Sequence, residues 1–325
     1  MPQASHNLYD YLQARLAAFL DELRLLSAVD CGTHNKAGVE WVGQYVRAKL
    51  TTLGMRVETQ PHARTGDTLV ARGYGAGSAR LLLIGHLDTV YPDGWPQAHP
   101  FKIDGDSARG PGTADMKAGL LAGCYALEAL HAQGFDDFAE IAFVLNSDEE
   151  IGSPTSRELI EREAYGRDAA LVLECGRENG DIVSARNGIA HYTLSVQGRS
   201  AHAGVEPERG RNAILELAHQ VIAAQGLNGS IPGATVNVGV ISGGTVVNVV
   251  PAGAQAQIDV RARDQAGLDA ISAALHKLAT QATVPDTHAT LAGTILRPPM
   301  EKTPATARLV SLYQIAARAL GLDVH

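Results

Sequence analysis

The chain has 325 residues, of which 45% are hydrophobic and 19% are charged, and these proportions exclude disordered and fibrous classes of protein. At roughly 150 residues per domain, the length predicts two domains. The 27 Lys and Arg residues stand against 35 Asp and Glu residues, the net charge is −8, and no block of five like charges occurs. Nucleic-acid binding is therefore not expected.

The apolar runs are short, and even those such as residues 81–84 fall far below the roughly 18 residues that a membrane-spanning helix needs. Charged residues interrupt the first predicted helix, so no secretory leader is indicated. We expect a cytoplasmic protein with no membrane partner, the alternative being a processed exported form. Three cysteines at wide spacings indicate reduced thiols rather than a disulfide framework.

The first half of the chain alternates helical and extended patterns. The predicted elements are helices at 7–29 and 39–53, strands at 56–59, 68–71 and 81–84, a helix at 116–132, a strand at 141–145, a helix at 155–163 and a strand at 169–173. This alternation predicts an α/β sheet with helices on its faces.

After about residue 183 apolar and polar residues alternate, as in Tyr192, Leu194 and Val196, which is typical of a half-exposed strand. A helix at 212–224, strands at 235–241 and 256–262, a helix at 266–280 and a strand at 289–295 follow. This order is the split β-α-β-β-α-β pattern. We expect it to form a second domain, residues 184–296, inserted between residues 1–183 and residues 297–325, where a last helix is predicted at 305–320.

The segment Gly85-His86-Leu87-Asp88-Thr89-Val90 directly follows a predicted buried strand. This places His86 and Asp88 at the carboxyl end of that strand, where α/β sheets hold their functional sites. A histidine that binds metal through one ring nitrogen usually donates its other N–H to a carboxylate, and Asp88 fits that role. Taken alone, the pair is also compatible with a simple hydrogen bond in a loop.

Acidic residues stand at three further junctions. Asp115 begins a predicted helix, Glu149 and Glu150 follow the strand at 141–145, and Glu174 follows the strand at 169–173. In isolation these patterns are typical of a helix cap, a solvated turn and a charge reaching water. Together with His86, they place a histidine or an acidic residue at four successive strand or helix ends, which we expect to lie at the same edge of the sheet. Imidazole and carboxylates without cysteine favour zinc or a similar divalent ion, and two ions bridged by one carboxylate would activate a water.

The motifs GHLDTV, GPGTADMKAG, SDEE and LECG resemble those of the co-catalytic two-zinc exopeptidases and deacylases. This family includes glutamate carboxypeptidase, aminoacylase, acetylornithine deacetylase and succinyl-diaminopimelate desuccinylase. The resemblance runs from about residue 32 to residue 262 and is strongest toward glutamate carboxypeptidase, through HLDTVYP and SDEEIGSPTSRELI. It implies a catalytic domain with a mixed sheet flanked by helices, and an inserted lid and dimerisation domain.

The resemblance also implies two zinc ions per subunit, with cobalt or manganese as alternatives. By position, His86 and Glu174 would bind the first ion, Glu150 the second, and Asp115 would bridge them. Glu149 resembles the family's general base, which takes a proton from the attacking water and later gives it to the leaving amine.

Further positions match by resemblance alone. Asp88 matches the family's orienting carboxylate. His202, in Gly198-Arg199-Ser200-Ala201-His202-Ala203-Gly204, resembles the lid histidine that reaches a partner subunit's active site and stabilises the oxyanion. Asn248 and Arg261 match residues that hold the substrate's free carboxylate. From the pattern alone, His202 would be interpreted as a surface histidine and Arg261 as an ordinary ion-pair partner.

One feature departs from the family. A histidine past a glycine-rich GGxxD segment supplies the last ligand of the second zinc in the family, and no such segment follows Arg297. His276, His288 and His325 lack that context, so none is assigned. We expect either a fragment or a weakened second zinc site, and in both cases poor activity, or none, of the chain as given.

The sequence therefore predicts a metal-dependent amidohydrolase that releases a C-terminal amino acid, with glutamate as the leading candidate, from a small peptide or N-acyl amino acid. A homodimer through the second domain is expected, because the split pattern leaves an unpaired edge strand. Two alternatives stay open. One is an N-acyl-amino-acid deacylase with the same zinc site, and the other is a non-hydrolytic homologue that binds carboxylates.

Overall fold

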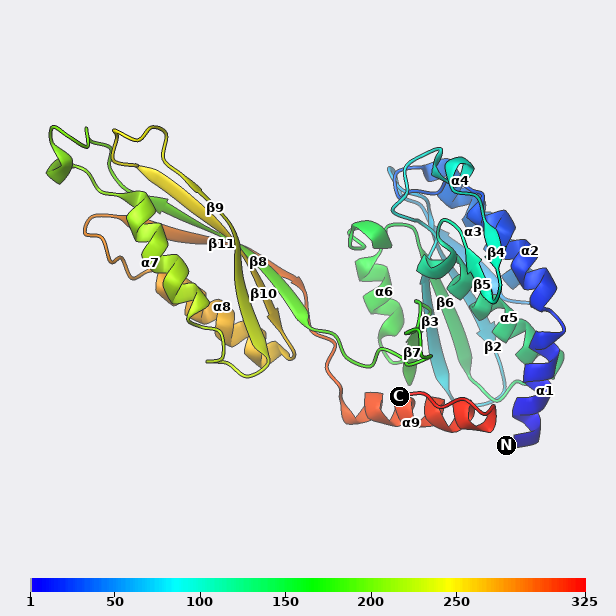
Figure 1. Cartoon of the computed structure of the whole chain (residues 1–325). Coiled ribbons are helices and arrows are strands. Elements are labelled where there is room, and N and C mark those ends of the chain that lie inside the picture. The colour runs from blue at the N-terminus through cyan, green and yellow to red at the C-terminus, as the bar shows by residue number, and fades with distance from the viewer. Residues whose placement is uncertain (1) are drawn as a thin grey trace. The chain divides into compact units, whose positions relative to one another are not determined.

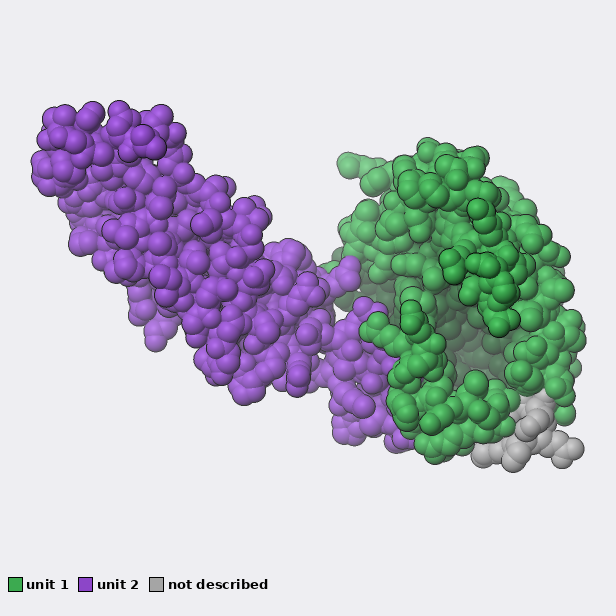
Figure 2. Space-filling model, viewed as in Figure 1, with its two compact units in different colours: residues 1–181, 312–325 green, residues 182–311 purple. Residues whose placement is uncertain are grey.

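The computed structural model describes residues 2–325. The chain divides into two compact units, residues 1–181 with 312–325 and residues 182–311 (Figure 2). Among the described residues, no helix is both long and apolar enough to cross a membrane.

The first unit contains a five-stranded mixed sheet (Figure 1). Its strands lie in the order β1 (Arg56–Gln60), β2 (Thr68–Tyr74), β6 (Glu140–Asn146), β3 (Arg80–His86) and β7 (Ala169–Val172). Strand β3 runs parallel to both β6 and β7, whereas β2 is antiparallel to β1 and β6. Every residue of β6 is buried, in agreement with its continuous apolar run.

Helices cover both faces of this sheet. One apolar cluster joins it to α2 (Leu16–Ser27), α3 (Lys36–Thr52) and α5 (Ala118–Ala132), with residues such as Leu26, Val42 and Leu121 at its centre. A smaller cluster on other side chains of the sheet contains Leu159 of α6 (Arg157–Ala164). The remaining elements are α1 (Pro2–Gln13), the short helix α4 (Trp95–Ala98), the hairpin β4 (Lys102–Asp104) and β5 (Ser107–Arg109), and the part of α9 (Pro304–Ala319) from residue 312 onward.

The single helix predicted at 7–29 is wrong, because α1 and α2 are separate helices. The chain leaves the helical conformation at Arg15, where φ is −104° and ψ is 0°. There the Arg15 guanidinium donates to Glu128 of α5 at 2.8 Å. The break between α1 and α2 thus coincides with a tertiary contact, and the apolar periodicity of the segment does not indicate it.

The second unit is a four-stranded antiparallel sheet with two helices (Figure 1). Its strands are β8 (Gly188–Gln197), β9 (Ala234–Gly243), β10 (Gly253–Ala262) and β11 (His288–Arg297), in the order β11-β8-β10-β9. Helices α7 (Ala213–Gln225) and α8 (Gln265–Ala279) share one apolar cluster with the inward side chains of these strands. The predicted split β-α-β-β-α-β order is confirmed.

Local sequence signals define several helix starts. The side chains of Asn35, Asn212 and Asp264 each accept a hydrogen bond from a main-chain N–H in the first turn of α3, α7 and α8. Such caps satisfy donors that have no partner within the helix. They fix where α3, α7 and α8 begin.

The topology of the first unit determines where its functional groups gather. Because β3 is parallel to β6 and β7, the carboxyl ends of these three strands meet at one edge of the sheet. His86 is the last residue of β3 and pairs in register with Asn146, the last residue of β6. The acidic residues that follow β6 and β7 therefore lie beside the imidazole of His86.

Candidate active site

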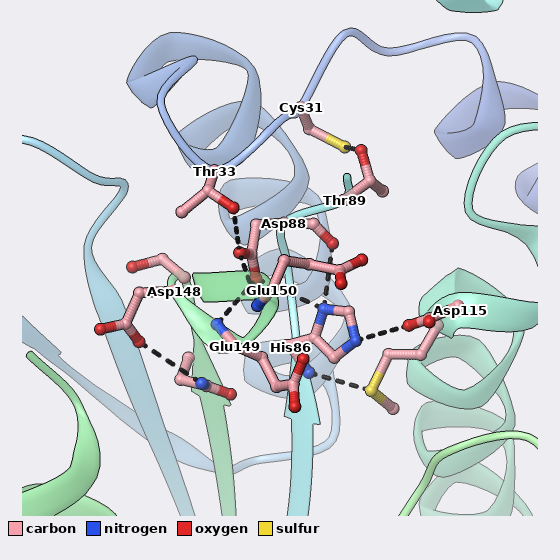
Figure 3. A network of polar contacts seen from close by, with 12 residues as sticks. Cys31, Thr33, His86, Asp88, Thr89, Asp115, Asp148, Glu149 and Glu150 are labelled. Carbon is pink, nitrogen blue, oxygen red and sulfur yellow. Dashed lines mark hydrogen bonds and ion pairs between the residues drawn. The ribbon is translucent and has the colours of Figure 1, made fainter. Parts of the chain in front are cut away.

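His86 stands at the centre of the polar cluster at this sheet edge (Figure 3). The residue is 1% exposed. Its Nδ1 lies 3.0 Å from the main-chain oxygen and 3.3 Å from Oδ1 of Asp88. Its Nε2 faces two other carboxylates, with Asp115 Oδ1 at 2.8 Å and Glu174 Oε1 at 3.4 Å. The ring therefore presents one nitrogen to Asp88 and the other to the candidate metal ligands.

Asp88 connects three parts of the first unit. Its carboxylate accepts a hydrogen bond from the Thr33 hydroxyl at 2.6 Å and from the main-chain N–H groups of Glu149 and Glu150, both at 3.3 Å. The side chain is buried. Asp88 thus fixes both the ring of His86 and the backbone that carries the two glutamates.

Asp115 lies in the segment Thr113–Lys117, which precedes α5 and is kinked, since Asp115 (φ −124°, ψ 96°) and Met116 (φ −131°, ψ 36°) are not helical. Its side chain is 59% exposed, in contrast to the buried side chains of His86 and Asp88. The next residue, Met116, is buried, and its sulfur accepts the main-chain N–H of His86 at 3.0 Å. The segment thereby presents the Asp115 carboxylate to the open side of His86 Nε2.

Two groups of side chains have the composition and spacing of a metal site. His86, Glu149 and Glu174 each offer a ligand atom within 4.8 Å of the others, and so do His86, Asp115 and Glu150. One imidazole and carboxylate oxygens suit a divalent ion such as zinc. All four predicted metal ligands, and the predicted general base, are brought together at the sheet edge.

The charge balance of the cluster also favours a cation. Burial and repulsion from Asp115 raise the pKa of Glu150 to about 7. Burial lowers the pKa of His86, but hydrogen bonds with Asp88 and Glu174 outweigh it and raise this pKa to about 11. Negative charges packed this closely hold protons where no cation separates them. Bound divalent ions would displace those protons.

Asp148, the remaining acidic residue of the Asp148-Glu149-Glu150 run, does not belong to this cluster. Asp148 is fully buried, and its carboxylate accepts hydrogen bonds from the main-chain N–H and the hydroxyl of Thr155, each at 2.7 Å. Burial raises the pKa of Asp148, but the hydrogen bonds from Ser156 and Thr155 lower it overall. Asp148 anchors the loop that carries Glu149 and Glu150.

The candidate residues of the second unit fall into two places. His202 forms a bridge with Val249, and the N–H of Ala203 donates to the main-chain oxygen of Asn248 at 3.0 Å, so His202 and Asn248 lie on adjoining loops. Arg261 lies near the other end of β10, in register with Ile189 of β8. The eight steps along the strand from Gly253 to Arg261 span roughly 26 Å, at ~3.3 Å per residue.

Arg261 is paired on its own strand. Its Nε donates to Asp259 Oδ2 at 2.9 Å, and Asp259 also contacts His191 Nε2 at 3.0 Å. The Arg261 side chain is 52% exposed. Its guanidinium therefore remains accessible to a ligand while Asp259 fixes one edge of it.

Two residues of the site were not predicted from the sequence. Thr33 donates to Asp88 across 55 residues of sequence, and no local pattern signals that contact. Lys117 belongs to the GPGTADMKAG motif, yet a lysine is ordinarily exposed, and here it is 1% exposed. The motif itself was the signal by which Lys117 could have been found.

Comparison with known proteins shows the family to which this chain belongs. The family model described as a peptidase dimerisation domain matches residues 184–287. Carboxypeptidase G2 of Pseudomonas sp. (strain RS-16) is 32% identical over 313 residues, which cover 94% of this chain and 75% of the relative. The chain belongs to the co-catalytic zinc exopeptidase and deacylase family.

Further relatives agree with this family assignment. Succinyl-diaminopimelate desuccinylase of Afipia carboxidovorans is 30% identical over 233 residues, which cover 66% of this chain and 60% of that enzyme. The chain thus spans about three quarters of the first of these family members and three fifths of the second. The family consists of metallopeptidases and amidohydrolases, so the chain is a metal-dependent hydrolase by descent.

Solved structures show the same fold at lower identity. The aminopeptidase PepT of Bacillus cereus has a TM-score of 0.78 at 23% identity, covering 94% of this chain and 83% of its own. A metallo-carboxypeptidase of Sulfolobus solfataricus has a TM-score of 0.66 at 15% identity, covering 94% and 84%. The mixed α/β fold predicted from the sequence is confirmed.

Proposed function

We propose that this protein hydrolyses the amide bond of a C-terminal residue, with glutamate as the leading candidate, in a small peptide or N-acyl amino acid. The observation that carries the proposal is the arrangement around His86, whose Nε2 faces Asp115 at 2.8 Å and Glu174 at 3.4 Å. The relationship to carboxypeptidase G2 supports a substrate with a free carboxylate.

We propose that this donor set holds two zinc ions, the second with one ligand fewer than in the family. His86, Asp115 and Glu174 would hold one ion, and Asp115 and Glu150 would hold the other, which makes Asp115 the bridging ligand. Contacts of His86 Nε2 with both Asp115 and Glu174 support the first set. The grouping of Asp115 with Glu150 beside His86 supports the second. When bound, such ions polarise the carbonyl and lower the pKa of water.

Glu149 and Asp88 have separate tasks in this mechanism. Glu149 accepts a proton from the attacking water and passes it to the departing amine, as a general base that then acts as a general acid. Asp88 does not react but keeps His86 in the orientation that exposes Nε2. Its hydrogen bonds from the main-chain N–H groups of Glu149 and Glu150 also hold the base beside the ligands.

Residues of the second unit would recognise the substrate. Arg261 offers a planar guanidinium, which binds a carboxylate through two parallel hydrogen bonds, and Asn248 adds a neutral donor. His202 would donate to the oxyanion that develops on the carbonyl. Since Asn248 lies in the loop before β10 and Arg261 near the far end of that strand, we infer that one copy of the unit does not bring both to the same carboxylate.

A homodimer accounts for this separation. In the proposed arrangement, His202 and Asn248 come from one copy and Arg261 from the other. Strands β9 and β11 are the two edges of the second unit's sheet, and an edge strand is a ready pairing surface. The match of residues 184–287 to a peptidase dimerisation domain supports association through this unit.

A deacylase acting on N-acyl amino acids is the second candidate function, favoured by the succinyl-diaminopimelate desuccinylase relative. The zinc site would serve both reactions, and the substrate pocket would differ. Turnover of N-acetylglutamate, of a dipeptide ending in glutamate and of the α-amide of each substrate separates the possibilities. We expect both acids to be cleaved far faster than their amides. Equal cleavage of acid and amide would overturn the carboxypeptidase proposal.

A further inference from the structure

The last turn of α2 and the connection that follows it, residues 26–33, contact two of the loops that carry candidate metal ligands. One loop, residues 86–89, contains His86 and Asp88, and the other, residues 110–117, contains Asp115. In the sequence, His86 and Asp115 are 29 residues apart. Their relative placement is therefore a tertiary property, and the 26–33 segment is well placed to determine it.

On the Asp115 side, Lys117 makes the principal contact. Its Nζ donates to the main-chain oxygen of Leu26 at 2.9 Å and to that of Val29 at 3.4 Å, and the residue is 1% exposed. The Ser27 hydroxyl donates to the main-chain oxygen of Pro111 at 2.9 Å. Burying an ammonium group is costly unless it is hydrogen-bonded, so these acceptors strongly fix its position. The loop of Asp115 is thus tied to α2 at both of its ends.

On the His86 side, Thr33 makes the corresponding contact. Its hydroxyl donates to Asp88 Oδ2 at 2.6 Å, and its main-chain N–H donates to the oxygen of Thr89 at 3.3 Å. The N–H of Thr89 in turn donates to the oxygen of Cys31 at 2.9 Å. All three side chains are buried together with Asp88. The hydroxyl of Thr33 orients the carboxylate that in turn orients His86.

We propose that Thr33 and Lys117 are positioning residues that hold the two ligand loops at the separation needed for His86 and Asp115 to bind the same ion. This inference rests on the proposed two-metal function. Neither side chain contacts the candidate ion site directly, since Thr33 acts through Asp88 and Lys117 through the backbone of residues 26–29. Loss of such supporting contacts typically weakens metal binding 10- to 100-fold.

The test measures the zinc affinity of metal-free protein by competition with a chelating dye. Thr33→Val removes the hydroxyl at nearly constant volume, and Thr33→Ser restores it. Lys117→Met removes the ammonium group. Lys36→Met is the control, because Lys36 Nζ also donates to two main-chain oxygens, those of His62 and Thr65, outside the two ligand loops, although it pairs with Glu40 and Asp67 as well.

We expect Thr33→Val and Lys117→Met to weaken zinc binding about 10- to 100-fold, and Thr33→Ser and Lys36→Met to bind zinc as the unmodified chain does. The melting temperature of each metal-free variant is measured alongside, because a purely structural role lowers that temperature without changing zinc affinity. If Lys117→Met does not fold, the Thr33 pair decides.

Unchanged zinc affinity in Thr33→Val, with or without a lower melting temperature, would overturn the positioning role. Equal losses in Thr33→Val and Thr33→Ser would overturn it too, because the hydroxyl would then be irrelevant. If the unmodified chain bound no zinc, the proposed two-metal function would fail first, and this inference with it.

Discussion

His86 Nε2 and Asp115 Oδ1 lie 2.8 Å apart, so the nitrogen that faces the candidate ligands holds a proton shared with a carboxylate. An ion that binds both atoms must displace this proton. Since the pKa of His86 is raised to about 11 and that of Glu150 to about 7, zinc binding near pH 6 is expected to release protons from both groups. Near pH 8.5 the release from His86 remains and that from Glu150 is largely gone.

Calorimetric titration of zinc in buffers of different ionisation enthalpy measures this release. A larger number of protons at pH 6 than at pH 8.5 agrees with the cluster as described. A release that does not depend on pH over this range would show that Glu150 is not part of the ion site.

The two adjacent glutamates are expected to differ when each is changed to glutamine. Glu149→Gln removes a base but no ligand in the proposed roles, so turnover should fall by at least ~100-fold, the lower range of general base catalysis, with zinc content retained. Glu150→Gln removes a ligand and should lose zinc. Elemental analysis and turnover are measured on both variants. Retention of both zinc and activity by the two variants would refute the assignment.

Specificity is expected to depend on Arg261 more than on Asn248. Removing a charged hydrogen bond costs ~1.5 to 3 kcal/mol, or roughly 10- to 150-fold in kcat/KM. Arg261→Ala should therefore erase most of the preference for an acid over its amide. Asn248→Ala should erode the preference less, because a neutral donor contributes less.

The two substitutions and the two substrates form a cycle, which isolates the contribution made to the carboxylate itself. The variant His219→Ala, changed on α7 away from these residues, serves as the control. A loss of the same size on acid and amide in Arg261→Ala would assign Arg261 a structural role through its contact with Asp259.

A buried cluster of ion pairs lies at the end of the first unit's sheet opposite the candidate active site, and it predicts how the stability of the fold depends on pH. Glu140 is 5% exposed and contacts Arg72, Arg80 and Arg167 at 2.9 to 3.1 Å. Burial raises the pKa of Glu140, but the hydrogen bonds from Arg167 and Arg80 outweigh it and lower this pKa to about 2. Because the pKa of Glu140 is lower in the folded state, its ionised form stabilises the fold at pH values above about 4.5, the pKa of an unperturbed glutamate. That stabilisation is lost as the pH falls toward 2.

Glu140→Gln should therefore be destabilised on the order of 3 kcal/mol at pH 7 and should lose less stability than the unmodified chain between pH 4.5 and pH 2. Urea unfolding at pH 7, 4 and 3 measures the difference. The exposed Glu161→Gln is the control. Parallel loss of stability by Glu140→Gln and the unmodified chain would show that Glu140 is not the group responsible.

Much of the fold is predictable because its strands are short apolar runs between polar segments. The run Leu81 to Ile84 lies within β3, and the alternation at Tyr192, Leu194 and Val196 lies within β8. The hairpin of β4 and β5 escapes prediction, since its three-residue strands are mostly exposed and polar. The alternation of apolar and polar residues indicates which side chains are buried, and β4 and β5 bury almost none of theirs.

The candidate site likewise has residues that are predictable from the sequence and contacts that are not. His86 and the acidic residues are predictable because each lies at or near the end of a strand or just before a helix, and parallel strands end at one edge. The contacts of Thr33 with Asp88 and of Lys117 with Leu26 join residues 55 and 91 positions apart. Such pairings arise from packing, which local patterns do not encode.

The most direct test of the proposed function is the rate of N-acetylglutamate hydrolysis as zinc is added back to metal-free protein. We predict a rate that is low, because the second ion lacks the family's last ligand, but that rises with zinc occupancy, reaches its limit at two zinc ions per chain and disappears when a chelator is added. A rate that is independent of zinc, or no hydrolysis with two ions bound, would contradict the proposal that His86 and its surrounding carboxylates form a two-zinc hydrolase site.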